Sequence, residues 1–328
     1  MEKKRIAYLD ALKGLCILCV VEGHVLSTNG FKPYDSLSSM MLYSFGLPIF
    51  FVISGFLAYK PSMAVKDVWD NIYKKFMFLV IPAVIFRMAL SMMHHKNVFS
   101  FIVDGMGGYW FTAVLFECFL IYYLVMLVIK NDKWRIGILI ALSLAGLMVK
   151  SIDEDFGPAI IDLHRLSKLF QFFVVGLLAR KYREQYESLM QNEIMKVVLL
   201  VTFFSVLFSM TYPMHPVLHR FLRDVVLRYF GTFALISFFT CHDDYFRREN
   251  KINALINYLG QKSLAIYLLH YFFLPKFLPR PEWFNGLNMV TVHLLALLYA
   301  VAITALCLVF IEFLSYSKYI RKYAFGQK

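Results

Sequence analysis

The sequence predicts an all-α membrane protein, a polytopic bundle of about ten transmembrane helices with both termini in the cytoplasm. Two observations predict this class. Hydrophobic residues make up 59% of the 328 residues, charged residues only 17%, and the mean hydropathy is +0.60. This composition leaves too little polar surface to cover a water-soluble globule. Apolar stretches long enough to cross a hydrocarbon core about 30 Å thick also recur along the chain.

These stretches predict helices rather than the strands of a β-barrel. Barrel strands alternate apolar and polar residues, whereas residues 12–21 here are almost continuously apolar. Short polar breaks separate the stretches, and no soluble domain is appended, so we expect one transmembrane domain over residues 1–328. The expected spans are residues 11–28, 37–59, 76–94, 111–129, 135–149, 166–179, 195–212, 226–241, 263–279 and 289–313.

The basic residues predict the orientation of the bundle. If alternate loops are compared, one set carries 22 Lys and Arg residues and the other carries 8. Lys and Arg accumulate in short cytoplasmic loops, so both termini are expected inside and the number of spans is expected to be even. The formal net charge of +12 is then a topology signal rather than a nucleic-acid-binding patch.

The cysteines and the loops exclude several classes of site. All five cysteines lie within or at the edge of predicted spans, which argues against a secreted disulfide framework. Cys16 and Cys19 form a C-x-x-C pattern, but it lies in an apolar helix without a second ligand pair, so helix packing explains it better than redox or metal chemistry. No Gly-rich phosphate loop is present. We therefore expect no resident cofactor or metal, and a function located in the bundle.

Ionisable residues within the spans are the strongest candidates for function. Each costs about 2.5–3.5 kcal/mol at the centre of a membrane helix and must face a partner or a wet cavity. His24, Arg87, Glu117 and His270 are the leading cases. Lys13 and His24 are eleven residues apart, which places them on one helix face about 16 Å apart. Glu22 lies about 200° from His24, so the partner that orients His24 is expected from another helix.

Several segments follow one another in a recognisable order. The first runs from Arg5 to His24 and is followed by residues 45–57 (FGLPIFFVISGFL). These segments resemble, in order and spacing, the acyltransferase-3 family of membrane O-acyltransferases, and the resemblance covers essentially the whole chain. The later segments are Lys74-Lys75 ahead of residues 79–82 (LVIP), residues 109–111 (YWF), residues 172–176 (FFVVG), residues 258–270 (YLGQKSLAIYLLH) and Glu312.

The resemblance implies O-acylation of a carbohydrate, usually acetylation of a cell-surface glycan, with acetyl-CoA or another acyl-CoA as the cytoplasmic co-substrate. It also implies a bacterial cytoplasmic (inner) membrane protein. The family has an arginine, ten intervening residues and a catalytic histidine; His24 matches, but Lys13 replaces the arginine and lacks its bidentate fork. The family also has two arginines three residues apart at the third helix, where this chain has Lys75 and Phe78.

The chemistry of the residues agrees with this function. Acyl transfer from a thioester to a hydroxyl needs a base, and a neutral imidazole suits that role, so His24 is predicted as the general base. Glu117 and His270 are predicted as further catalytic residues. Cations near the cytoplasm would bind the phosphates of acyl-CoA, and hydroxyl or N–H donors would stabilise the oxyanion. We predict Lys13, Lys74, Lys75 and Arg5 for the donor, and Ser54, Trp110 and Tyr267 for oxyanion or substrate contacts.

Alternatives to these roles exist. His24, Glu117 and His270 can also form hydrogen bonds between helices, Lys74 and Lys75 also serve as topology signals, and Arg5 can pair with Asp10 at the membrane surface. A function of another class is proton-coupled secondary transport of a sugar or acyl metabolite through a relay of His24, Glu117 and His270. Missing repeat symmetry argues against it. The sequence leaves open the acceptor, and whether transfer is direct or passes through an acylated intermediate.

Overall fold

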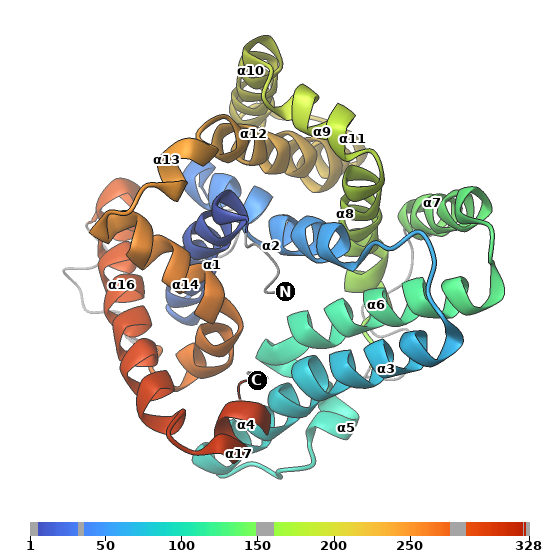
Figure 1. The fold of residues 1–328 in the computed structure, drawn as a ribbon. Helices are drawn as coiled ribbons and strands as arrows, with labels where there is room; N and C mark the ends of the chain where they lie inside the picture. The colour runs from blue at the N-terminus through green and yellow to red at the C-terminus, as the bar shows by residue number, and fades with distance from the viewer. Residues whose placement is uncertain (1–5, 32–35, 149–160, 276–286, 324, 326–328) are drawn as a thin grey trace. The chain divides into compact units, whose positions relative to one another are not determined.

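The computed structural model describes residues 6–31, 36–148, 161–275, 287–323 and 325. These residues form helices joined by turns, without a β-strand, which confirms the all-helical class for the described part of the chain (Figure 1). The helices are α1 (Ala7–Thr28), α2 (Leu37–Ala58), α3 (Val65–Lys75), α4 (Ile81–Met93), α5 (Phe101–Asp104), α6 (Trp110–Val128), α7 (Asp132–Met148), α8 (Leu163–Lys181), α9 (Arg183–Met190), α10 (Glu193–Ser209), α11 (Pro216–Phe221), α12 (Arg228–Cys241), α13 (Asp243–Arg247), α14 (Lys251–Leu269), α16 (Met289–Leu314) and α17 (Lys318–Tyr323).

Short π- and 3-10 turns join some of these helices. The π-helical turn Phe76–Val80 links α3 to α4, and Leu222–Leu227 links α11 to α12. The 3-10 turn Gly107–Tyr109 precedes α6, and His270–Phe272 follows α14. π-helical turns often lie at functional positions, whereas 3-10 turns are common at helix ends. The 3-10 turn after α14 contains the predicted site residue His270.

Several helices are suited to crossing a membrane. By length and composition, five segments of the described chain qualify, and a sixth is added if α9 and α10, which meet at a bend of 70°, form one broken span. A multi-pass membrane protein is therefore supported, while ten spans and cytoplasmic termini stay predictions. The five segments are Leu37–Ala58, Val65–Met93, Gly107–Val128, Pro216–Cys241 and Met289–Leu314.

One predicted span, residues 263–279, is placed wrongly. The helix is α14, which begins at Lys251 and ends at Leu269, and residues 276–279 lie outside the described part of the chain. The first half of α14 is polar, so hydropathy does not detect it. It is helical because the Asn250 side chain accepts a hydrogen bond from the backbone N–H of Asn253 and caps the first turn.

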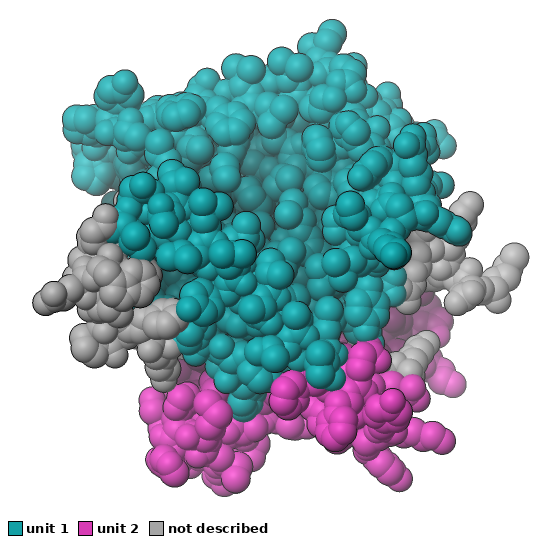
Figure 2. All heavy atoms as spheres, turned by 90° about the vertical axis from the view of Figure 1, so that its left-hand side faces the viewer, with its two compact units in different colours: residues 1–50, 184–309 teal, residues 51–183, 310–328 magenta. Residues whose placement is uncertain are grey.

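The chain groups into two compact units, each discontinuous in sequence. Unit 1 comprises Met1–Phe50 and Glu184–Val309, and unit 2 comprises Phe51–Arg183 and Phe310–Lys328. Figure 2 colours the two units separately. The single domain over residues 1–328 stays a prediction.

Glycines allow two helix pairs to approach closely. In unit 1, a Cβ added to Gly260 of α14 would lie 1.8 Å from the carbonyl oxygen of Asp10 in α1, and one added to Gly14 would lie 2.2 Å from that of Ile256. In unit 2, Gly55 and Gly176 stand in the same relation, each with a carbonyl oxygen of the facing helix 2.0 Å from its added Cβ. Small residues permit such backbone contact between membrane helices. The family-like segments that contain these glycines are therefore helix-packing sites.

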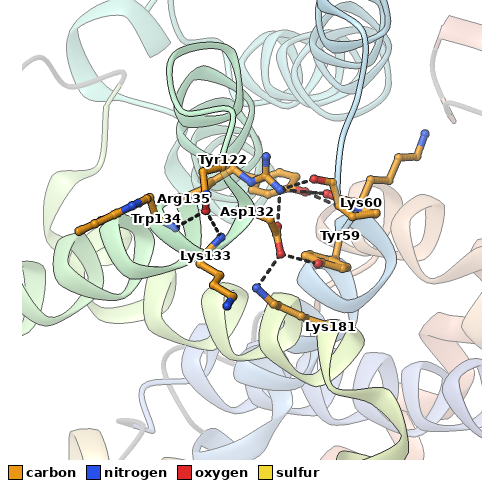
Figure 3. Close-up of polar contacts among 10 residues, drawn as sticks. Tyr59, Lys60, Tyr122, Asp132, Lys133, Trp134, Arg135 and Lys181 are labelled. Carbon is orange, nitrogen blue, oxygen red and sulfur yellow. Dashed lines mark hydrogen bonds and ion pairs between the residues drawn. The ribbon is translucent and has the colours of Figure 1, made fainter.

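A polar cluster ties three helix ends together in unit 2 (Figure 3). Asp132, at the start of α7, accepts hydrogen bonds from Arg135, from Lys181 Nζ at 2.6 Å and from Tyr59 Oη at 3.0 Å. Arg135 is 1% exposed and also donates to the carbonyl oxygen of Pro61 at 2.7 Å. The end of α2, the start of α7 and the end of α8 thus meet, as expected if their loops face the same side of the membrane.

Candidate functional site

Helix α1 carries the two residues of the predicted histidine motif. Most of its residues are buried, so its polar side chains must find partners within the protein. Lys13 pairs with Asp10 on the preceding turn, with Nζ 2.6 Å from Oδ1, and both side chains remain partly exposed. The Asp10 carboxylate therefore partly neutralises the cation that was predicted to bind the acyl donor.

His24 takes its hydrogen-bond partner from another element, as expected. Its Nε2 lies 3.1 Å from the hydroxyl oxygen of Tyr271, in the turn that follows α14. The His24 ring also lies 5.0 Å from the His270 ring, centroid to centroid. The close packing of α1 against α14 through Gly14 and Gly260 brings these side chains together.

His270 is completely buried, and only one of its two ring nitrogens has a hydrogen-bond partner among the described residues. Its Nδ1 lies 3.2 Å from the carbonyl oxygen of Ile266, so Nδ1 carries the proton and donates. Its Nε2 is then an acceptor, and this atom is buried without a hydrogen-bond partner among the described residues. Buried polar atoms are normally paired, so the lone pair of His270 Nε2 is suited to accept a hydrogen bond from a hydroxyl group. The predicted Tyr267 lies beside it, with ring centroids 5.7 Å apart.

Glu22 faces away from His24, as the helical geometry predicts, and has its own partner. Its Oε1 lies 2.9 Å from Nδ1 of His293, at the start of α16. Nε2 of His293 lies 3.3 Å from Oγ of Ser39, in the first turn of α2. The charge of Glu22 is therefore directed to a second histidine and does not orient His24.

The other predicted site residues belong to unit 2. Lys75 Nζ lies 3.9 Å from the centre of the Phe119 ring, an attractive cation–π contact, and Lys74 is exposed. Glu117 Oε2 is buried without a hydrogen-bond partner among the described residues. Trp110 packs against the guanidinium of Arg165, and Ser54 is partly buried. Their roles beside His24 stay predictions, and Arg5 lies outside the described residues.

Three residues close to these histidines and to Glu22 are not predicted from the sequence: Tyr271, His293 and Ser39. Tyr271 directly follows His270, but a tyrosine in an aromatic-rich chain gives little signal. His293 lies inside the predicted span 289–313, so the rule that singled out His24 and His270 should have found it too. Ser39 gives no signal in sequence, because only the meeting of three helices makes it notable.

Comparison with known proteins identifies the family. The acyltransferase-3 family model, described as an acyltransferase domain, matches residues 6–312. Comparisons with curated proteins and with solved structures give no match. The matched range covers nearly the whole chain and includes His24, His270 and His293. The match favours acyl transfer over secondary transport. The chain therefore belongs to the acyltransferase-3 family and is a membrane acyltransferase.

Proposed function

We propose that this protein transfers an acetyl group from acetyl-CoA to a hydroxyl of a cell-surface or exported glycan in a bacterial cytoplasmic membrane. The observation that carries the proposal is the cluster of His24, His270 and Tyr271 within an acyltransferase-3 chain. Three proton-exchanging side chains meet there, and no carboxylate of the described residues is bonded to His24. This arrangement suits a neutral general base.

The reaction would proceed with His24 as the base. The acceptor hydroxyl takes the position of the Tyr271 hydroxyl beside His24 Nε2, gives its proton to that nitrogen, and its oxygen bonds to the acyl carbon. The bond between the acyl carbon and its leaving group breaks, and His24 returns the proton to that group, which is the CoA sulfur if transfer is direct. The displaced Tyr271 hydroxyl donates to the developing oxyanion. His270 Nε2 can hold a second hydroxyl of the sugar.

The acyl donor would lie along α1. Lys13 lies eleven residues, about 16 Å, before His24, so one extended ligand can contact both. Lys13 would bind donor phosphates once they compete with Asp10, and Lys74, Lys75 and Arg5 are proposed to add positive charge.

The test is incorporation of label from acetyl-labelled acetyl-CoA into polysaccharide and glycolipid by membranes that contain the protein. We expect label with the wild type and none above background with His24→Ala at equal expression. His215→Ala, which removes an exposed histidine of unit 1, is the matched control and should keep wild-type activity. Label that survives His24→Ala would refute the mechanism, and uptake of sugar into vesicles without acetyl-CoA would favour transport.

A further inference from the structure

A second histidine centre lies on the other face of α1, and it has the order of groups found in serine acyltransferases and hydrolases. Ser39 Oγ lies 3.3 Å from Nε2 of His293, and Nδ1 of His293 lies 2.9 Å from Oε1 of Glu22. A hydroxyl, an imidazole and a carboxylate thus follow one another from α2, α16 and α1. This is the geometry by which a base activates a nucleophile and a carboxylate orients the base.

The hydrogen bonds fix the direction in which each proton points. Glu22 accepts from Nδ1–H of His293, so Nε2 presents its lone pair to Ser39. The Ser36 hydroxyl donates to Ser39 Oγ at 3.0 Å, so the hydroxyl proton of Ser39 is available to His293. Each member of the chain is therefore oriented for removal of a proton from Ser39.

Burying the Glu22 carboxylate and the Ser39 hydroxyl costs free energy. Ser39 is 1% exposed and Glu22 is 7% exposed. An ionisable pair within membrane helices is expensive and marks a functional site more often than a packing site.

A small apolar pocket lies on the same two helices as Glu22 and His293. It lies between the end of α1 and the start of α16, where Val25 is one turn beyond Glu22 and Val292 adjoins His293. Its mostly apolar lining leaves room for a group of about the size of one methyl.

We propose that Ser39 is a nucleophile that carries the acyl group as an ester, with His293 as its base and Glu22 as the residue that orients His293. Ser39 Oγ gives its proton to His293 Nε2 and bonds to the acyl carbon of acyl-CoA, the carbon–sulfur bond breaks, and the proton passes to the CoA sulfur. The acceptor hydroxyl beside His24 then gives its proton to His24 and bonds to the acyl carbon, and Ser39 Oγ takes up that proton as the ester bond breaks. The proposal rests on the proposed function for its acyl donor.

The first experiment does not need that donor. The full-length protein in native membranes is treated with a fluorophosphonate probe, and mass spectrometry locates and quantifies the modified residue. We expect modification of Ser39 in the wild type, none at this position in Ser39→Ala, and rates lowered on the order of 10³-fold or more in His293→Gln and Glu22→Gln. Ser205→Ala removes an exposed hydroxyl from α10 of the same unit and is the matched control, with an unchanged rate.

A second variant guards against misfolding of Ser39→Ala. Ser39→Cys keeps a nucleophile of similar size, and its alkylation by iodoacetamide should fall when His293→Gln is added, because the imidazole no longer promotes the thiolate. A wild type unreactive toward the probe, or alkylation of Cys at position 39 that ignores His293, would overturn the proposal.

Acyl-CoA then separates this proposal from the proposed function. With labelled acetyl-CoA, we expect a hydroxylamine-sensitive label on the wild type that is absent from Ser39→Ala. His24→Ala should lose transfer to the glycan yet keep fluorophosphonate labelling of Ser39. Labelling of Ser39 in a protein that acetylates no glycan would refute the proposed function alone, whereas glycan acetylation undiminished in Ser39→Ala would overturn the ester intermediate.

Discussion

Replacing Asp132 by Asn removes one negative charge from the polar cluster of unit 2 and leaves its shape nearly unchanged. The Arg135 side chain is 1% exposed and is held by the carbonyl oxygens of Lys60 and Pro61 as well as by Asp132, so it cannot turn toward water. The variant therefore keeps a buried guanidinium without its counter-charge. Breaking a buried ion pair in this way costs about 3–5 kcal/mol.

The exposure of Asp132 sets the expected value within that range. Its side chain is 25% exposed, so water screens part of the interaction and we expect the lower end, about 3 kcal/mol. A loss of that size raises the ratio of unfolded to folded protein by about 150-fold, since about 1.4 kcal/mol is a factor of ten. At about 2–4 °C per kcal/mol for a unit of this size, the apparent Tm falls by about 6–12 °C.

The assay is thermal unfolding of the purified protein in detergent at one fixed scan rate. Asp70→Asn is the matched control, because it removes an exposed carboxylate from α3 in the same unit. Adding Arg135→Met to Asp132→Asn should recover most of the loss, since the uncompensated charge is then gone. The reasoning is refuted if Asp132→Asn and Asp70→Asn unfold at the same temperature, or if the double variant is no more stable than Asp132→Asn.

Four further outcomes are expected. The Asp132 carboxyl lies just before the predicted span 135–149. Burial alone would raise its pKa, but hydrogen bonds from Lys181, Tyr59 and Arg135 outweigh burial and lower the pKa. In thermal melts at each pH, the difference in stability between wild type and Asp132→Asn should therefore persist above about pH 5 and close as the pH falls below about 4. Gly260→Ala should unfold at markedly lower temperature than Gly46→Ala, because an added Cβ at Gly260 meets a carbonyl oxygen at 1.8 Å and one at Gly46 meets its nearest atom at 3.9 Å; equal melting temperatures would contradict the close packing. Tyr271→Phe removes the proposed oxyanion donor and should lower kcat about 10²- to 10³-fold with little change in the acetyl-CoA KM, whereas unaltered kinetics would exclude Tyr271 from the site. Asp10→Asn frees the Lys13 cation and should lower the acetyl-CoA KM roughly two- to five-fold, and a raised KM would show that Lys13 does not bind the donor.

The sequence predicts the helical class well, because lipid demands long apolar stretches that can be read directly. The helix boundaries predicted from hydropathy are wrong where a helix is polar. The first half of α14 is an example, since its cap at Asn250 and its contact of Gly260 with Asp10 come from tertiary packing rather than from hydropathy. The polar α3, which extends the third span to Val65, is missed for the same reason.

Some residues of the candidate site are predictable from the sequence and others are not. His24 and His270 are predictable because a histidine in a membrane span stands out, and the structure brings their rings to 5.0 Å. The angle between Glu22 and His24 also follows from helix geometry alone. Ser39 is not predictable, because its neighbour His293 is 254 residues away and a serine in a helix has no pattern of its own.

The partners of α1 arrive late in synthesis. Tyr271 follows His24 by 247 residues, and His293 follows Glu22 by 271 residues. At about 5–20 residues per second, a ribosome needs roughly 14–54 s to produce His293 after Glu22. During that time α1 holds a carboxylate and an imidazole in the membrane without their final partners, so water or lipid headgroups must solvate them. Chains that stop before residue 293 would leave Glu22 without its partner His293.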